Sequence, residues 1–357
     1  MKHRPLLALL LPLATALAST AHAAPSQAKT ATAASTASTS TATTDCSVRA
    51  EPGNDLQAMI DSLPNDGKPA TLCLSAGDFH LNKLLSIQRN GLRLRGQGDK
   101  TVLRMRDGVQ QPTIVLGDYQ HERPLRPISD VQISQLQIVG GDAQKEFMPE
   151  LPYLSNSLVV VRSGQNIQLT HLRVNKCRSA CLLSEYDSHD LLIAHNDISG
   201  ATWDGVSFNR SAKIKLFDNT IHDNVAAGIT TEHLEDSEIQ NNRLERNGSQ
   251  GLYLSDSRGN LFTGNQFIDN KGAGLYLTCS IRQRTPEILC WDNSMSQNNT
   301  FEHNIFRGNP FTYMVGVNSA ANCKGSDFQP NLWRDNEGTA SGVDILPDRY
   351  GYCVRFK

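Results

Sequence analysis

The chain has 357 residues, of which 39% are hydrophobic and 20% are charged. These fractions are typical of a water-soluble globular protein, and they exclude a membrane bundle or a wholly disordered chain. The formal charge is −2, from 34 basic and 36 acidic residues, so the overall charge gives no indication of a nucleic-acid partner. At this length we expect either two ordinary domains or one repeat protein.

Residues 1–23 are predicted to be a signal peptide, because a basic start and an apolar segment precede the small residues Ala21 and Ala23. The apolar segment, Leu6 to Ala18, is shorter than the roughly 20 residues that span a bilayer. We therefore expect an exported protein, periplasmic or secreted, without membrane insertion. Residues 24–45, rich in Ala, Ser and Thr, are predicted to form a flexible linker. Residues 46–357 remain as one folded domain, expected to be a monomer.

Eight cysteines in an exported chain favour four disulfides. Zinc binding by Cys177 and Cys181 is the alternative, but no second Cys or His pair stands at ligand spacing beyond them. Proximity in the sequence suggests the pairs Cys46–Cys73, Cys177–Cys181, Cys279–Cys290 and Cys323–Cys353.

The folded part is predicted to begin with a short helix and then to change to strands. Asn54 or Asp55 can cap a helix through Leu63, which Pro64 and Gly67 would end. Such a helix could cap one end of the fold. Strands are expected next over residues 70–74, 79–81, 92–94 and 102–103.

A repeat of 23 residues dominates the second half of the chain. It is marked by three sets of residues, namely Gly205, Gly228, Gly251 and Gly274; Asn219, Asn242 and Asn265; and Asn224, Asn247 and Asn270. Short alternating strands separated by Asn and Gly exclude a helical solenoid and predict an all-β, right-handed parallel β-helix of about 23 residues per turn. The asparagine columns are interpreted as structural ladders rather than ligands.

With this repeat and its capping helix, the chain resembles the pectin-lyase-like parallel β-helix superfamily from about Cys46 onward. That resemblance implies the fold and is compatible with exported polysaccharide lyases, hydrolases and epimerases, but also with tailspikes and adhesins. The function must therefore be sought in side chains that point out of the coil.

Strand alternation predicts which side chains point outward. Because Val206 and its equivalents should point inward, the outward columns are expected to be Ser184, Ser207, Thr230, Tyr253 and Tyr276, and then Tyr186, Asn209, Glu232, Ser255 and Thr278. At the end of the same strands, a column of ionisable residues is expected from Asp187, Arg210, His233 and Asp256. A charge ladder without catalytic purpose is the alternative interpretation of this column.

Two insertions are predicted to flank these strands and to form the walls of a groove. The first runs from Gly141 to Ser155. The second runs from Cys279 to about Asn298 and carries Arg282, Arg284 and Trp291.

Such a groove suits an acidic polysaccharide, because aromatic rings stack on sugars and arginine binds carboxylates. Removal of the C5 proton of a uronate needs a neutralised carboxylate, a base and an acid, roles that we assign to Arg210, His233 and Tyr253 in that order. Asp187 and Glu232 are further catalytic candidates. Substrate contacts are expected from Tyr186, Asn209, Asp256, Tyr276, His189, Arg282 and Trp291.

The segment Asp187-Ser188-His189-Asp190 resembles the Asp-Pro-His-Asp motif of mannuronan C5-epimerases, and Asn209-Arg210 is similar to the Ser-Arg that ends their next rung. The resemblance implies that Asp187 and His189 join the site and that Arg210 neutralises the carboxylate. Ser188 replaces the motif's proline, and here the motif falls in a turn. The sequence indicates no certain cofactor, and it leaves open whether Ca²⁺ assists Arg210 through Asp187 or Asp256.

Two other functions remain open. A glycoside hydrolase would use a pair of carboxylates, either Glu232 with Asp256 or Asp187 with Glu232. A non-catalytic polysaccharide-binding protein is the second alternative, and Trp203 could serve either by stacking a sugar or simply by covering a turn. A metal stripe and scattered exposed histidines are alternative interpretations of His171, His195 and His222.

Overall fold

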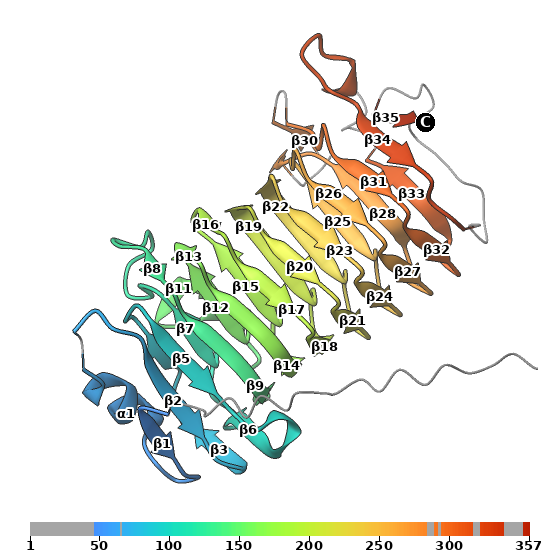
Figure 1. The fold of residues 1–357 in the computed structure, drawn as a ribbon. Coiled ribbons are helices and arrows are strands. Elements are labelled where there is room, and N and C mark those ends of the chain that lie inside the picture. The colour runs from blue at the N-terminus through green and yellow to red at the C-terminus, as the bar shows by residue number, and fades with distance from the viewer. Residues whose placement is uncertain (1–45, 65, 284–288, 292–293, 317–321, 339–352) are drawn as a thin grey trace, which may run out of the picture. The chain divides into compact units, whose positions relative to one another are not determined.

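The computed structural model describes residues 46–64, 66–283, 289–291, 294–316, 322–338 and 353–357. These residues belong to one compact unit, Asp45–Lys357. Within it, short parallel strands stack in successive coils (Figure 1). The predicted signal peptide and linker lie outside the described residues. No described helix is long and apolar enough to cross a membrane.

Two parallel sheets form the walls of the coil, and they confirm the predicted right-handed parallel β-helix. The first sheet consists of β1 (Val48–Ala50), β2 (Ala70–Leu74), β3 (Gly77–Leu81), β5 (Leu92–Arg95), β6 (Thr101–Met105), β9 (Gln132–Val139), β14 (Gln168–Cys177), β17 (Leu192–Ala194), β18 (Asp197–Ala201), β20 (Lys215–Phe217), β21 (Thr220–His222), β23 (Glu238–Gln240), β24 (Arg243–Glu245), β26 (Leu261–Thr263), β27 (Gln266–Ile268), β31 (Thr300–Glu302), β32 (Ile305–Arg307), β34 (Asn331–Arg334) and β35 (Val354–Phe356). The second sheet consists of β4 (Leu85–Ile87), β7 (Ile114–Leu116), β8 (Ile128–Ser129), β12 (Val159–Arg162), β13 (Gly164–Gln165), β15 (Leu182–Glu185), β16 (Ser188–His189), β19 (Val206–Ala212), β22 (Ile229–Glu235), β25 (Leu252–Ser255), β28 (Ala273–Thr278) and β33 (Phe311–Val315).

The remaining elements are short. Helix α1 (Leu56–Ser62) and the 3-10 helices η1 (Gly98–Lys100) and η2 (Asn322–Lys324) lie outside the sheets. Two antiparallel pairs complete the described strands, β10 (Phe147–Met148) with β11 (Leu151–Ser155) and β29 (Ile281–Gln283) with β30 (Leu289–Cys290).

The strand register confirms the 23-residue step. Val206 pairs with Ile229, Ile229 with Leu252, and Leu252 with Leu275, each on the next rung of the second sheet. All four side chains are buried. Because like residues stack on one another, apolar side chains form continuous inner columns, which include the stacked rings of Phe267 and Phe306, 4.7 Å apart.

Each coil turns at residues with positive φ, and a buried asparagine often follows. Asp218 has a φ of 52°, and its successor Asn219 is buried. Asn219 donates from its backbone nitrogen and from Nδ2 to Oδ1 of Asn242, over 3.0 and 2.8 Å, and also donates from Nδ2 to the Ile193 carbonyl over 3.0 Å. Each asparagine therefore links three coils, which confirms the interpretation of these columns as structural ladders.

The repeated glycines exist because the ladder leaves no space for a side chain. A Cβ atom on Gly228 would lie 2.8 Å from the Gly251 carbonyl oxygen and 2.9 Å from Asn247 Nδ2. Gly205 and Gly251 meet the equivalent atoms of their own neighbours. The glycine and asparagine columns are thus two parts of one packing arrangement.

Helix α1 begins at Asp55, whose side chain accepts a hydrogen bond of 3.0 Å from the Ala58 backbone nitrogen. Leu56 and Ile60 point into the core of the first coils. This confirms the predicted N-terminal helix and selects Asp55 from the two expected caps.

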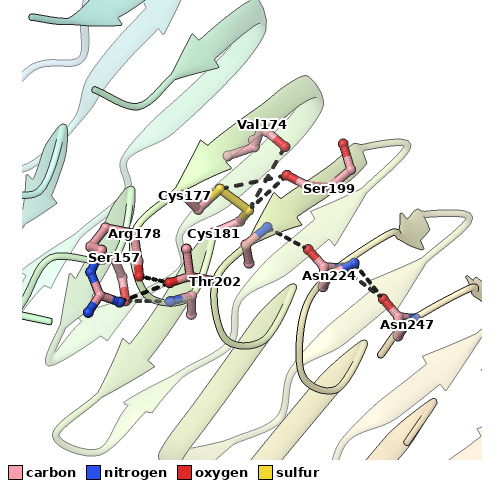
Figure 2. Close-up of a disulfide and its surroundings, with 11 residues drawn as sticks. Ser157, Val174, Cys177, Arg178, Cys181, Ser199, Thr202, Asn224 and Asn247 are labelled. Carbon is pink, nitrogen blue, oxygen red and sulfur yellow. Dashed lines mark hydrogen bonds between the residues drawn. A yellow bond between two sulfur atoms is a disulfide. The ribbon is translucent and has the colours of Figure 1, made fainter. Parts of the chain in front are cut away.

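All four predicted disulfides are present. Figure 2 shows Cys177–Cys181, which closes the turn after β14 beside the ladder of Asn224 and Asn247. The disulfide excludes the zinc interpretation of these two cysteines.

Candidate functional site

The second sheet bends sharply at one column of residues. Arg210, His233 and Asp256 have φ values of 45°, 61° and 43°, which belong to the left-handed region of backbone conformation. At each of these residues the chain turns from the outward-facing strand into the next segment of the coil. Asn209 pairs with Glu232 and Ser211 with Leu234, so Arg210 and His233 lie on adjacent rungs. We call this column the corner.

The corner contains one extra residue on the rung before Arg210. Ser184 pairs with Phe208 and Ser188 with Ser211, so three residues lie opposite two. Tyr186 and Asp187, with φ values of 56° and 60°, therefore both lie at the corner.

Two expectations about the outward face are corrected by this bulge. Ser184 is buried and aligned with the inward Phe208, not with Ser207. Tyr186 lies at the corner, and Glu185 instead occupies the place beside Asn209 that was expected for Tyr186. The prediction used a uniform 23-residue step, whereas the step from β15 to β19 is 24 residues.

A pocket of about 390 Å³ opens at the corner. It brings together four of the predicted site residues, Asp187, His189, Arg210 and His233. The complete lining is Asp187, His189, Arg210, Ser211, Ala212, Lys213, His233 and Glu235. The sequence analysis did not select Lys213 and Glu235, which follow Arg210 and His233 on the same strands or turns.

Arg210 presents an accessible guanidinium to this pocket. Its Nε lies 3.9 Å from Asp187 Oδ1, and the two side chains are 48% and 84% exposed. An exposed ion pair at this distance contributes little, so Arg210 remains open to a carboxylate from a ligand. The Arg210 guanidinium also lies 5.3 Å from the centre of the Tyr186 ring.

Two histidines of the pocket each have Nδ1 close to a carboxylate. His233 Nδ1 lies 2.9 Å from Asp256 Oδ2, and His189 Nδ1 lies 2.7 Å from Asp190 Oδ2. Burial raises the pKa of Asp256, while the nearby His233 lowers it. Such a pairing fixes the imidazole orientation and leaves Nε2 for a ligand, because neither Nε2 has a hydrogen-bond partner among the described residues.

Arg162 is a buried charge next to the corner that the sequence analysis missed. Its guanidinium donates to Glu185 Oε1 over 2.7 Å, to the Asp118 and His121 carbonyls over 2.8 and 2.9 Å, and to the Glu122 carbonyl over 2.7 Å. Burial raises the pKa of Glu185, against the lowering effect of Arg162. An arginine at the end of the apolar run Val159–Val161 is the one sequence signal for this arrangement.

The structure does not bring Tyr253 to the pocket. Tyr253 pairs with Thr230, three residues before the position of His233, which is about 10 Å along the strand. Its ring instead stacks on Tyr276 at 5.3 Å, and burial raises the pKa of Tyr276. The two tyrosines therefore form a separate aromatic pair on the outer face.

The prediction that side chains point outward holds for only part of the second column, which was expected to run from Tyr186 to Thr278. Asn209 and Glu232 are exposed on the face that leads to the corner. Ser255 and Thr278 are buried instead, and Ser255 Oγ donates to the carbonyl of Cys279, the first residue of the second insertion, over 2.7 Å.

The first insertion packs directly on the outer face of the early coils. Met148 and Leu154 of the β10–β11 pair join a cluster with Val115 and Val160. In the second insertion, Trp291 is 55% exposed, the side chain of Arg282 is not among those described, and Arg284 lies outside the described residues. Trp203 is also exposed. The exposed positions next to the corner on this face are therefore Asn209 of β19 and Glu232 of β22.

Among the described residues, no group of three or more His, Cys, Asp or Glu side chains is arranged to hold a metal ion. The rings of His171 and His195 are tilted by 34° to each other, with their centres 4.9 Å apart. His222 lies 3.1 Å from Asp197 and 2.6 Å from Asp223 through its two ring nitrogens.

A family model described as a right handed beta helix region matches residues 157–333, the part of the chain that contains the corner. This match agrees with the right-handed parallel β-helix fold seen in the strand topology. No curated protein matches it by sequence.

Solved structures of proteins with several functions are similar to this chain. A family 28 exopolygalacturonase of Yersinia enterocolitica has a TM-score of 0.54 at 13% identity, over 81% of this chain and 63% of that one. PfbA, a surface adhesin of Streptococcus pneumoniae, has a TM-score of 0.52 at 11% identity, over 81% and 76%. The A-module of the mannuronan C-5 epimerase AlgE4 of Azotobacter vinelandii has a TM-score of 0.49 at 16% identity, over 84% and 94%.

Proposed function

We propose that this β-helix protein acts on an acidic, uronate-containing polysaccharide by removing the C5 proton, as a lyase or a C5-epimerase. The observation that carries the proposal is the composition of the corner pocket. An accessible arginine lies there between two histidines that are each oriented by an aspartate. These are the groups that C5 chemistry requires.

Arg210 would bind the uronate carboxylate. The C5 proton is weakly acidic because the carbanion formed at C5 places its charge on the adjacent carboxylate. A guanidinium in contact with that carboxylate stabilises the developing charge, and it does so more strongly in the transition state than in the ground state. Lys213, which lines the same pocket, would add a second positive charge.

His233 would act as the base. Asp256 accepts from Nδ1–H, so Nε2 is the atom that takes the C5 proton, and the imidazolium formed is stabilised by the Asp256 carboxylate. This assignment retains the role predicted for His233. Asp256 becomes the group that orients His233 rather than a group that binds substrate.

His189 replaces Tyr253 as the proposed acid. It lies two rungs before His233, about 10 Å away along the coil, with Arg210 on the rung between them. Histidines on both sides of a bound sugar can serve its two faces. In a lyase, His189 would give its proton to the O4 atom as the C4–O bond breaks and the C4–C5 double bond forms. In an epimerase, it would give the proton to the opposite face of C5.

The four disulfides support a site of action outside the cytoplasm, because such bonds persist in oxidising compartments. We therefore propose a periplasmic or secreted enzyme that meets its polymer after export.

The test is absorbance in the unsaturated-uronate band while the purified protein is incubated with alginate, polygalacturonate or hyaluronan, together with exchange of the C5 proton in deuterated water. His233→Asn and Arg210→Asn are the informative variants, because asparagine tolerates the left-handed backbone of the corner better than alanine does. We expect each to lower kcat by about 100-fold or more.

The control is Asp236→Asn, an exposed change at another left-handed turn position, outside the pocket lining. It should retain wild-type turnover. New absorbance that both site variants lose would support a lyase, and proton exchange without absorbance would support an epimerase. New reducing ends without either signal would instead indicate a hydrolase and overturn the proposal, as would turnover retained in His233→Asn.

A further inference from the structure

The ring of Tyr186 lies between two guanidinium groups. The Arg162 guanidinium lies 4.8 Å from the ring centre and the Arg210 guanidinium 5.3 Å from it. The two arginines come from the rungs before and after Tyr186, β12 and β19. The ring is therefore contacted from both sides along the coil and is not free to stack on a sugar as the sequence predicted.

The two arginines are held very differently. Arg162 is fully buried and bonded to three carbonyls and to Glu185. A guanidinium with that many fixed partners cannot change its orientation without losing several hydrogen bonds in a place that water cannot reach. Arg210 is half exposed, and its one ion pair, with the exposed Asp187, is long. Tyr186 thus contacts both a buried arginine with many hydrogen bonds and a half-exposed arginine with few contacts.

We propose that Tyr186 is a positioning residue that transmits the rigidity of Arg162 to Arg210 and so holds the Arg210 guanidinium ready for the carboxylate of an acidic sugar. This inference rests on the proposed function for its substrate class. Its physical basis is the attraction of a cation to the face of an aromatic ring, which at exposed sites corresponds to about a two- to five-fold effect on an equilibrium.

Substitutions of Tyr186 separate the ring from the hydroxyl group. Tyr186→Phe keeps the aromatic face, whereas Tyr186→Leu keeps apolar bulk without it. Phe356→Leu is the matched control, because it removes an exposed ring that contacts Tyr313 and Trp333 and, among the described residues, no arginine guanidinium. All three proteins should be checked for unchanged thermal unfolding before they are compared.

The first measurement needs no substrate. In the NMR spectrum, the Nε–H proton of Arg210 should carry a ring-current shift from Tyr186, assigned by its loss in Arg210→Lys. We expect the shift to disappear in Tyr186→Leu and to remain in Tyr186→Phe and Phe356→Leu. A shift that is unchanged in Tyr186→Leu would overturn the inference, whether or not the wild type acts on any polymer.

The second measurement uses galacturonate and mannuronate oligomers and their methyl esters. For the acidic oligomers, Tyr186→Leu should raise Kd, and KM where there is turnover, about two- to five-fold, and Tyr186→Phe should restore the wild-type value. The methyl esters, which lack the charge that Arg210 would bind, should show no such difference. An equal loss on acids and esters, or no rescue by phenylalanine, would contradict a positioning role. If the wild type turns over none of them, the proposed function fails, while the Arg210 shift still decides this inference.

Discussion

Replacement of the fully buried Arg162 should strongly destabilise this protein. Replacing it with methionine keeps the volume but leaves Glu185 mostly buried without its 2.7 Å partner and three carbonyls without their donor. Breaking a buried pair by removing one partner typically costs 3–5 kcal/mol. We therefore expect Arg162→Met to lower the free energy of unfolding by about 3–5 kcal/mol in urea denaturation.

A matched control separates the effect of losing a buried ion pair from the effect of losing an exposed one. Arg258 forms a 3.0 Å pair with Glu235, but both side chains are largely exposed. Arg258→Met should therefore change stability by no more than about 1 kcal/mol. The double variant Arg162→Met/Glu185→Leu should regain part of the loss, because it no longer buries an unpaired carboxylate. Equal effects of Arg162→Met and Arg258→Met would contradict this account.

Asp223 should make the stability of the protein sensitive to acid. Hydrogen bonds from Arg246, then from His222, lower the pKa of Asp223 from 3.8 to about 2. The folded state therefore binds this proton less readily than the unfolded state. The stabilising contribution is complete above pH 3.8 and is lost as the pH falls towards 2.

Two measurements test this pH dependence. The ¹³C signal of the Asp223 carboxyl should titrate near pH 2, and in Arg246→Gln its midpoint should move towards 3.8. Asp223→Asn should remove the corresponding part of the acid sensitivity in unfolding experiments. A midpoint at the ordinary value in the wild type would show that the pair with Arg246 does not persist in solution.

The asparagine ladder is the element that fixes the spacing of the coils. Asn242 Oδ1 accepts from the backbone nitrogen and Nδ2 of Asn219, and its Nδ2 donates to the Leu216 carbonyl over 2.8 Å. Asn242→Ala removes these three bonds, from the Asn219 backbone nitrogen, from one N–H of Asn219 Nδ2 and to the Leu216 carbonyl, while Asn219 Nδ2 keeps its bond to the Ile193 carbonyl. At about 1–3 kcal/mol for each orphaned group, we expect a loss of at least about 3 kcal/mol by denaturant unfolding.

Gln240 provides the comparison, because it lies on β23 just before this turn with a half-buried side chain that donates only to Glu238. Gln240→Ala should stay within about 0.5 kcal/mol of the wild type. A loss below about 1 kcal/mol for Asn242→Ala would mean that the neighbouring rungs relax to satisfy one another, and that the ladder is less rigid than its geometry indicates.

Most of the fold was predictable because every coil repeats the same local requirements. Gly228 is needed where a ladder carbonyl lies too close for a Cβ atom, and Asn219 is needed where three coils must be joined. Such requirements recur at a fixed interval, so they are visible in a single sequence. The disulfide pairs and the capping helix followed from proximity and from local capping chemistry.

The errors at the site arose where the repeat is interrupted. The extra residue at Tyr186 and Asp187 shifts the register between β15 and β19 by one position. The sequence does not show whether this extra residue lies before or after the corner. Tyr253 was expected near His233 because alternation gives the face of a side chain but not its distance along the strand. The position of Arg162 depends on carbonyls 40–44 residues away in the chain.

On the scale of the whole molecule, the disulfides differ in what they restrain. Cys46–Cys73 encloses 27 residues and ties β1 to β2, whereas Cys177–Cys181 encloses only 4. In the chain-entropy model, the longer loop contributes about 3.6 kcal/mol and the shorter about 2 kcal/mol.

We therefore expect Cys46→Ser/Cys73→Ser to lower stability more than Cys177→Ser/Cys181→Ser does. Calorimetry should also show whether the first coils unfold separately once β1 is released, since coils contact mainly their neighbours. The reverse order of stability would show that strain or packing, not loop closure, governs these bonds.

The ladder makes a single coil the unit by which this protein can lengthen or shorten. From β19 to β28, each strand pairs with the next one through residues that lie 23 positions apart in the chain. A tandem duplication of 23 codons would therefore add one complete coil, which lengthens the β-helix by about 4.8 Å along its axis. The hydrogen-bond donors and acceptors of the added coil would already match those of its neighbours. A duplication of 22 or 24 codons would leave one position without a match, and a local irregularity such as the bulge at Tyr186 and Asp187 would have to absorb it. Insertions and deletions in this region should thus be tolerated when they add or remove whole coils of 23 residues. The bulge before Arg210 marks one coil that already has 24 residues.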